Sequence, residues 1–202
     1  MRPRRFLIAS VLYGALAMSF PGHADIRLVQ VWAGQESQPL LSQSSPLQLH
    51  YTLQPGLGDG VRLMTIEQDP ARPRDTLRVR IQHQTSLAIS GEGPHLDLID
   101  WKHCTSSWQT IADPGDGRFQ IPEPTPEQAE CFPAFSKAEL LAAVRAQEGS
   151  NPSWERIAEG VPRAGEGASY VAPSLLRMKL ERWDGLRWVE VTQFDVSIEM
   201  GC

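Results

Sequence analysis

Apolar and polar residues alternate along several segments of the chain. In 47–53 the apolar positions are Leu47, Leu49, Tyr51 and Leu53, and in 76–82 an apolar face of Leu77, Val79 and Ile81 opposes a charged one. A period of two is typical of strands that bury one face. Less regular alternation predicts further strands over 26–32, 61–67 and 95–101. Short strands separated by Gly- and Pro-rich turns indicate a mainly β fold, a β-sandwich or a barrel-like antiparallel sheet.

The last third of the chain predicts a β-hairpin. Segments 176–183 and 186–198 flank Asp184-Gly185, a pair that favours a two-residue type I′ turn. Such a turn would set Trp183 opposite Leu186. It would also set Lys179 opposite Glu190 and bring Arg182 and Arg187 together near the tip. The core face would then carry four apolar residues, which are Met178, Leu180, Val189 and Val191. Later in the segment the apolar residues shift to the other alternate positions, which predicts a β-bulge near Thr192-Gln193.

The middle of the chain departs from this pattern. Residues 113–133 hold five prolines, which favours an extended surface loop. A helix is expected next, because Ser136 and Glu139 form a capping box ahead of the apolar stripe Leu140, Leu141 and Val144. Asn151-Pro152 predicts a second short helix that ends at Gly160. We therefore expect one or two short helices inserted between the strands.

The N-terminus resembles a secretory signal peptide. Three arginines precede the uncharged apolar run 6–20, and Gly22-His23-Ala24 offers small residues for cleavage. The run is shorter than the roughly 20 residues that a membrane-spanning helix needs. We expect cleavage after Ala24, a single β-rich domain over 25–202 with no membrane span, and a periplasmic location reached by general secretion. An extracellular location stays open.

Cleavage would also change the charge. Three of the 19 Lys and Arg residues and none of the 24 Asp and Glu residues lie before Asp25, so the formal charge would move from −5 to −8. An acidic protein is poorly suited to nucleic acid, whose binding depends on neutralised phosphates. A basic protein partner, such as a toxin or an enzyme, fits this charge better. Solubility alone is the alternative explanation.

The three cysteines would all enter an oxidising compartment. An even pair is then expected to form a disulfide, and we favour Cys104 with Cys131 across a loop rich in turn formers. Closing that loop would contribute roughly 3 kcal/mol on the chain-entropy model. Cys202 is the alternative partner of either cysteine, or it stays free.

The chain has few sequence motifs that suggest metal binding or catalysis. Asp113-Pro-Gly-Asp-Gly117 brings two carboxylates together but lacks the ligand spacing of a calcium loop, so it predicts a turn. His103 beside Cys104 has no further zinc-ligand motif near it. Neither a Gly-x-Ser-x-Gly elbow nor a His-Glu-x-x-His helix occurs. We therefore predict no catalytic, cofactor or metal residues and no enzymatic activity, although a scattered triad or carboxylate pair stays open.

The hairpin tip is the candidate partner-binding site. Tryptophan, arginine and an apolar residue on an exposed hairpin have the composition of a binding hot spot. The predicted site comprises Arg182, Trp183, Leu186, Arg187 and Trp188. The alternative is that the helices cover this face and the tryptophans are ordinary core.

These features favour a protein-binding domain, an inhibitor or immunity protein that blocks a toxin or a lytic enzyme. An accessory of an envelope, pilus or secretion assembly is the alternative, and there exposed strand edges would meet. A hydrolase of unknown type is a third hypothesis and would require a pocket of converging titratable groups.

Overall fold

The computed structural model describes residues 26–34, 38–43, 49–53, 60–71, 74–91 and 94–200. The expected signal peptide and Cys202 lie outside these residues. The fold is mainly β, as predicted, with ten strands and three short helices in the described part of the chain. The strands are β1 (Ile26–Ala33), β2 (Leu41–Gln43), β3 (Leu49–Leu53), β4 (Val61–Gln68), β5 (Leu77–Ser90), β6 (His95–Thr105), β7 (Gln109–Ala112), β8 (Arg118–Gln120), β9 (Ser169–Trp183) and β10 (Trp188–Ile198). The helices are α1 (Pro126–Ala129), α2 (Lys137–Glu148) and α3 (Pro152–Glu159).

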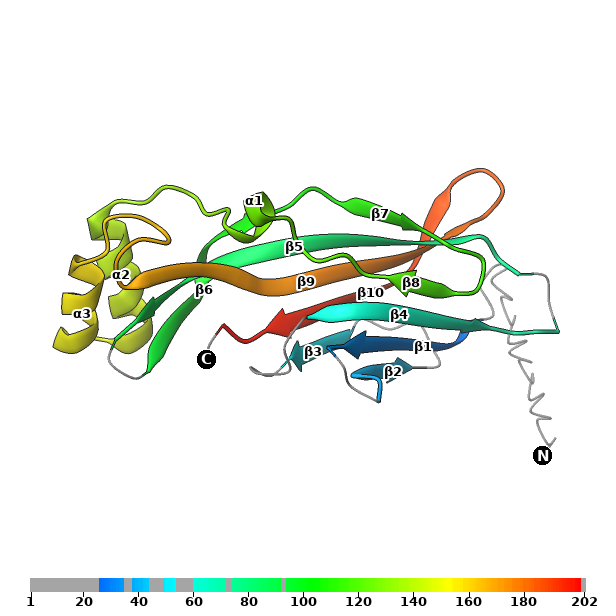
Figure 1. Cartoon of the computed structure of the whole chain (residues 1–202), viewed down its shortest axis with the longest axis horizontal. Coiled ribbons are helices and arrows are strands. Elements are labelled where there is room, and N and C mark those ends of the chain that lie inside the picture. The colour runs from blue at the N-terminus through cyan, green and yellow to red at the C-terminus, as the bar shows by residue number, and fades with distance from the viewer. Residues whose placement is uncertain are drawn as a thin grey trace, which may run out of the picture.

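Two sheets form a sandwich along most of the molecule (Figure 1). One sheet has the order β2-β1-β4-β8, and the other has the order β3-β10-β9-β5-β6, with β7 also paired to β5. All pairs are antiparallel except β3 with β10, which run parallel. The shared core draws on both sheets and includes Val31, Met64, Val79, Phe119 and Phe194, each at most 1 % exposed. The alternating apolar positions of the sequence supply these inward-facing residues.

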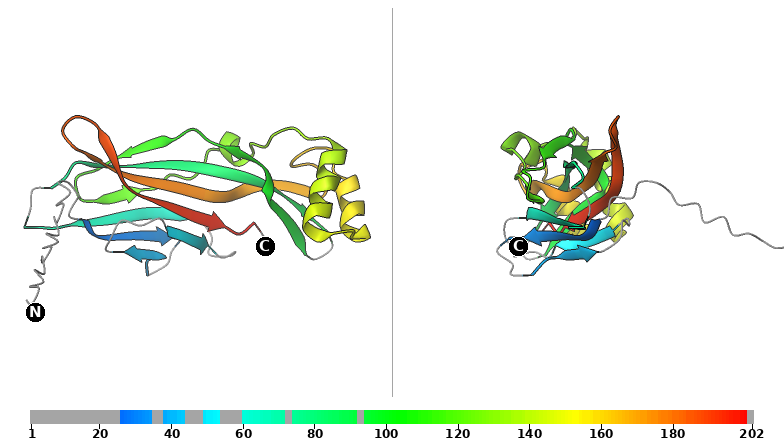
Figure 2. Two further views of the ribbon diagram at one scale, coloured as in Figure 1. Left: turned by 180° about the vertical axis from the view of Figure 1, so that it is seen from behind. Right: turned by 90° about the vertical axis from the view of Figure 1, so that its right-hand side faces the viewer.

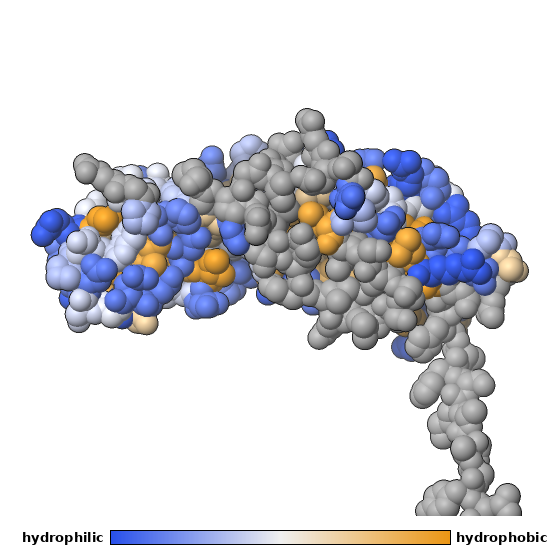
Figure 3. Space-filling model, turned by 90° about the horizontal axis from the view of Figure 1, so that it is seen from below, coloured by the Kyte–Doolittle hydropathy of each residue, from blue (hydrophilic) through white to orange (hydrophobic). Residues whose placement is uncertain are grey.

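A second core lies at the far end of the long strands. There β5, β6 and β9 extend beyond the sandwich, and α2 and α3 stand against them (Figures 1 and 2). Leu87 and Leu98 from the sheet pack with Leu140 and Val144 of α2 and with Ala158 of α3. On the face shown in Figure 3, apolar residues at this end form separate spots among hydrophilic ones. The helical end thus buries its apolar side chains between helix and sheet.

The predicted capping box starts α2. The Ser136 hydroxyl accepts from the Glu139 N–H at 3.3 Å, and the Glu139 carboxylate accepts from the Ser136 N–H at 2.7 Å. Leu140 and Val144 are fully buried and Leu141 partly so. Gly149, with φ of 67°, ends the helix. The second predicted helix is also confirmed, as α3 begins after the cap residue Asn151.

The prediction of one extended loop over 113–133 is wrong. Strand β8 pairs with β4 inside this segment, because Phe119 is wholly buried in the sandwich core. Thr125 and Gln128 then form a capping box around α1, with Pro126 at its first position. Proline prevented neither element, since β8 lies between prolines and the first turn of a helix tolerates one.

Polar residues are buried between the two cores, in a zone that we call the waist. His83, Gln84, Thr85, Ser86 and Ser174 are each no more than 6 % exposed. The Ser86 and Ser174 hydroxyls lie 2.8 Å apart, and the Thr85 hydroxyl donates to the Cys131 carbonyl at 2.5 Å. Register shifts occur here in β5 against both neighbours. These hydrogen bonds offset the cost of desolvating the hydroxyl groups of Thr85, Ser86 and Ser174.

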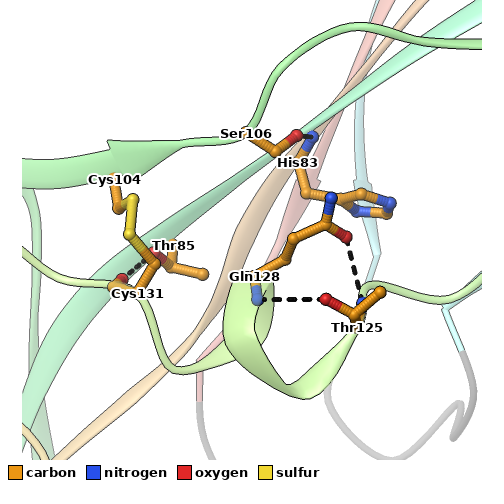
Figure 4. The surroundings of a disulfide bond; sticks show 7 residues. All are labelled: His83, Thr85, Cys104, Ser106, Thr125, Gln128 and Cys131. Carbon is orange, nitrogen blue, oxygen red and sulfur yellow. Dashed lines mark hydrogen bonds between the residues drawn. A yellow bond between two sulfur atoms is a disulfide. The ribbon is translucent and has the colours of Figure 1, made fainter.

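The expected disulfide joins Cys104 to Cys131, with the two Cα atoms 5.7 Å apart (Figure 4). It ties β6 to the segment between α1 and α2. Cys104 pairs with Thr85 across the sheet, and Thr85 bonds the Cys131 carbonyl, so the cross-link adjoins the waist.

Candidate protein-binding site

The tip of the β9–β10 hairpin differs from the predicted two-residue turn. Trp183 pairs with Trp188, which leaves a four-residue loop, Asp184 to Arg187. The Asp184 carboxylate accepts hydrogen bonds from the N–H groups of Leu186 at 2.8 Å and Arg187 at 2.9 Å. Gly185, with φ of 100°, supplies the left-handed backbone. The prediction of Trp183 opposite Leu186 is wrong because the Asp184 side chain caps a wider loop.

The hairpin tip also shifts the pKa of the Asp184 carboxylate. The hydrogen bonds from the Arg187 N–H and then the Leu186 N–H lower the pKa of Asp184. The ionised form that holds the loop is therefore favoured.

The wider loop changes the register of the hairpin. Lys179 pairs with Gln193, not with Glu190, and Leu180 pairs with Thr192, not with Val189. A shift between Glu190 and Thr192 supplies the expected bulge one residue earlier than predicted. Lys179 Nζ still reaches the Glu190 carboxylate at 2.7 Å.

The expected core face is correct only in part. Met178 and Leu180 are fully buried, and Val191 packs partly buried against the core. Val189 is half-buried opposite Arg182. After the bulge, Phe194 and Val196 return to the core as the phase change predicted, with Ile198 packed at its edge.

The two tryptophans form an aromatic pair beside the loop. Their ring centroids lie 5.5 Å apart at 60°, and the Arg78 guanidinium lies 4.3 Å from the Trp188 ring centroid. Trp183 is 40 % exposed and Leu186, in the loop itself, is 89 % exposed. The loop stands clear of both sheets in two views (Figures 1 and 2). The helices lie at the opposite end of the molecule and do not cover these tryptophans.

The two predicted arginines do not meet. Arg182 pairs with Val189 in the ladder, and its guanidinium lies 3.6 Å from the Asp75 carboxylate. Arg187 lies in the loop, 3.7 Å from the Asp184 carboxylate. Because side chains alternate along β9, Arg182 follows the face of Leu180, whereas Trp183 follows the face of Glu181. Arg182 therefore lies on a different face of β9 from Trp183, although its positive charge still helps to lower the pKa of Asp184 in the loop.

Sequence reasoning missed the residues that support the tip. Glu181 is 8 % exposed and lies 2.5 Å from Arg78 and 3.9 Å from Arg80. Trp108, just before β7, lies under Arg80 and Lys179, 5.4 and 5.2 Å from its ring centroid. The alternation in 76–82 predicted that Arg78 and Arg80 lie on the polar face of their strand. Only the pairing of β5 with β9 shows that this face lies beside Glu181.

The other candidate sites are accounted for by local structure. The carboxylates of Asp113 and Asp116 accept backbone N–H groups of Gly115 and Arg118, so Asp113–Gly117 is the predicted turn. Cys104 is held in the disulfide. Within the described ranges, no group of three or more His, Cys, Asp or Glu residues is arranged to hold a metal ion, and no helix is long and apolar enough to cross a membrane.

Comparison with known proteins finds no matching family model, no similar curated protein and no similar solved structure.

Proposed function

We propose that the protein is an exported, periplasmic protein-binding domain that inhibits a toxin or a lytic enzyme through the tip of its β9–β10 hairpin. One observation carries the proposal: Leu186, 89 % exposed, projects from a loop beside an aromatic pair in which Trp183 is 40 % exposed. Large apolar side chains presented together on a protrusion suit insertion into a concave partner, such as an enzyme cleft.

The tip is preorganised for such a role. The Asp184 carboxylate holds two loop N–H groups, and Arg78 packs on Trp188 while it pairs with Glu181. A loop held in one conformation loses less conformational entropy on binding than a flexible loop does. The disulfide between Cys104 and Cys131 suits an oxidising compartment and thus supports export.

The test compares two ends of the molecule. Leu186 is replaced by a photo-crosslinking residue in envelope preparations, and the captured partner is then purified and its toxic or lytic activity is titrated with the protein. The double variant Trp183→Ala/Leu186→Ala should weaken binding by about 100-fold or more, because hot-spot residues contribute about 2 kcal/mol each. Inhibition of the partner should be lost in parallel.

Ile99→Ala is the matched control. Ile99 is 38 % exposed, close to the exposure of Trp183, but it lies on β6 at the helical end. Its variant should bind and inhibit like the wild type. If Ile99→Ala abolished binding and the hairpin variant did not, the β6 edge would be the contact surface and an assembly accessory would replace the inhibitor.

A further inference from the structure

A pocket of about 630 Å³ opens at the waist, at one end of the sandwich. It is built from the start of β4, the middle of β5, the segment between β8 and α1, the first half of β9 and the end of β10. Figure 4 shows His83 of β5 together with Thr125, the N-cap residue of α1, and Gln128 of α1, beside the disulfide. We call this cavity the waist pocket. Its volume is in the range of small-molecule sites.

The walls of the waist pocket are mostly apolar. Leu176 and Met200 are each 2 % exposed, Val61 is 6 % exposed, and prolines from two segments complete the lining. Tyr170 also lines the pocket, and its hydroxyl donates to the Met200 carbonyl at 3.0 Å. A ligand here would gain most of its affinity from burying apolar surface.

The charged groups of the waist pocket have one sign. Glu123 and Glu199 line it and are exposed to solvent, and the described lining residues include neither lysine nor arginine. His83 also lines it and is 6 % exposed. Burial lowers the pKa of His83, so at neutral pH its ring adds no positive charge. Its Nε2 has no hydrogen-bond partner among the described residues.

We propose that the waist pocket binds a small cationic amphiphile, with its apolar body against the buried walls and one ammonium group beside Glu123 and Glu199. An anion of the same shape would meet two carboxylates and no cation from the described lining. An uncharged analogue would keep the apolar contacts but lose the ion pairing. This site is separate from the hairpin tip and does not depend on the proposed inhibitor function.

The test uses three probes that share an eight-carbon chain: octylammonium, octanoate and octanol. Each is titrated below its aggregation concentration, by calorimetry and by NMR of the full chain. Octylammonium should bind with one-to-one stoichiometry and at least about 10-fold more tightly than octanoate, with octanol between them. The ring signals of His83 should move on binding, whereas those of His103, outside the pocket lining, should not.

Two variants assign the effect to the pocket. Glu123→Gln/Glu199→Gln should remove the preference for octylammonium and leave octanol binding unchanged. Glu127→Gln/Glu130→Gln is the matched control, since it removes the same charge from α1 and its C-cap residue, and neither glutamate lines the pocket. Ala129→Trp, a half-buried lining position at the end of α1, should block all three probes.

Three results would overturn the proposal. Octanoate could bind as tightly as octylammonium, the preference could survive Glu123→Gln/Glu199→Gln, or Ala129→Trp could leave binding unchanged while the variant stays folded by circular dichroism. None of these outcomes bears on partner binding at the hairpin, so the two proposals fail separately.

Discussion

Strands β5 and β9 each pass through two different environments. Within the sandwich, β5 alternates buried and half-buried residues from Leu77 to Gln82, because one face meets the core and the other meets solvent. From His83 to Ile89, seven consecutive residues are buried. The same strand is therefore a surface strand in one half and an interior strand in the other. The difference shows that the alternation of buried and half-buried residues depends on what packs against each part of a strand. It is not a property of the strand as a whole.

The two halves also differ in the elements that pack against the long strands. In the sandwich half, a second sheet packs against the long strands. In the helical half, α2 and α3 pack against them, and the disulfide lies near the boundary between the two halves. We expect the sandwich to dominate global stability and the helical end to respond more locally. Four predictions test this difference.

Phe119→Ala should have the largest effect. Phe119 is wholly buried where β8 joins the sandwich, and truncating such a side chain costs about 3–5 kcal/mol. Urea unfolding would measure the loss, and hydrogen exchange should show it at both ends of the molecule. The exposed neighbour Arg118→Ala should change stability by no more than about 0.5 kcal/mol. Loss of protection at the β8 end alone would mean that the two halves unfold independently.

Removing the disulfide with Cys104→Ser/Cys131→Ser should lower the free energy of local opening at the helical end by about 3 kcal/mol, because the opened segment regains the freedom of the closed loop. Exchange protection should fall first in α1, α2 and β6, which the cross-link ties together. Adding a reductant to the wild type is the control and should reproduce the change. An equal loss in β1 and β4 would contradict a local role.

Ser136→Ala should lower stability by about 1 kcal/mol, since the hydroxyl caps the first turn of α2. The effect should be confined to exchange protection in α2 and α3. Ser150→Ala, exposed beyond the C-terminal end of the same helix, should have no measurable effect. Similar losses in both variants would show that the cap contributes nothing specific.

The smallest effect concerns pH. Hydrogen bonds from Lys102 and Ser136 lower the pKa of Glu139 to about 2. A depressed carboxyl pKa stabilises the fold above its unfolded value of about 4.5, and that contribution is lost as the pH falls toward about 2. NMR titration of Glu139 should show this midpoint, and Lys102→Met should raise it. A midpoint near 4.5 in the wild type would contradict the contacts described.

Sequence patterns predicted the elements that have one solvent face. The alternation in 76–82 and the capping box at Ser136 each reflect a local rule, and both elements are present. The second half of β5 was not predicted, because Gln84, Thr85 and Ser86 are polar yet buried at the waist. Hydrogen bonds to β9 and to the Cys131 segment explain this, and no local pattern records them.

The candidate site was predictable to a similar extent. Trp183, Leu186 and Trp188 were identified from composition, and they do gather at the hairpin tip. The register was wrong, since hydrogen bonding by the Asp184 side chain decided the loop length. Arg78 on β5 and Trp108, just before β7, are remote in sequence from the hairpin, so only the sheet order brings them beside it.

The position of β10 has a consequence for the order of folding. β10, the last strand in the described part of the chain, lies inside its sheet, between β3 and β9. The early strand β3 therefore has no neighbour in that sheet until residues 194–198 are free to pair with it. The β3 edge of this sheet can therefore form only after almost the whole chain is available, although β5, β6 and β7 pair earlier in the sequence, and such non-local pairing favours slow folding. A chain that threads through a membrane channel before it folds would benefit from such a delay.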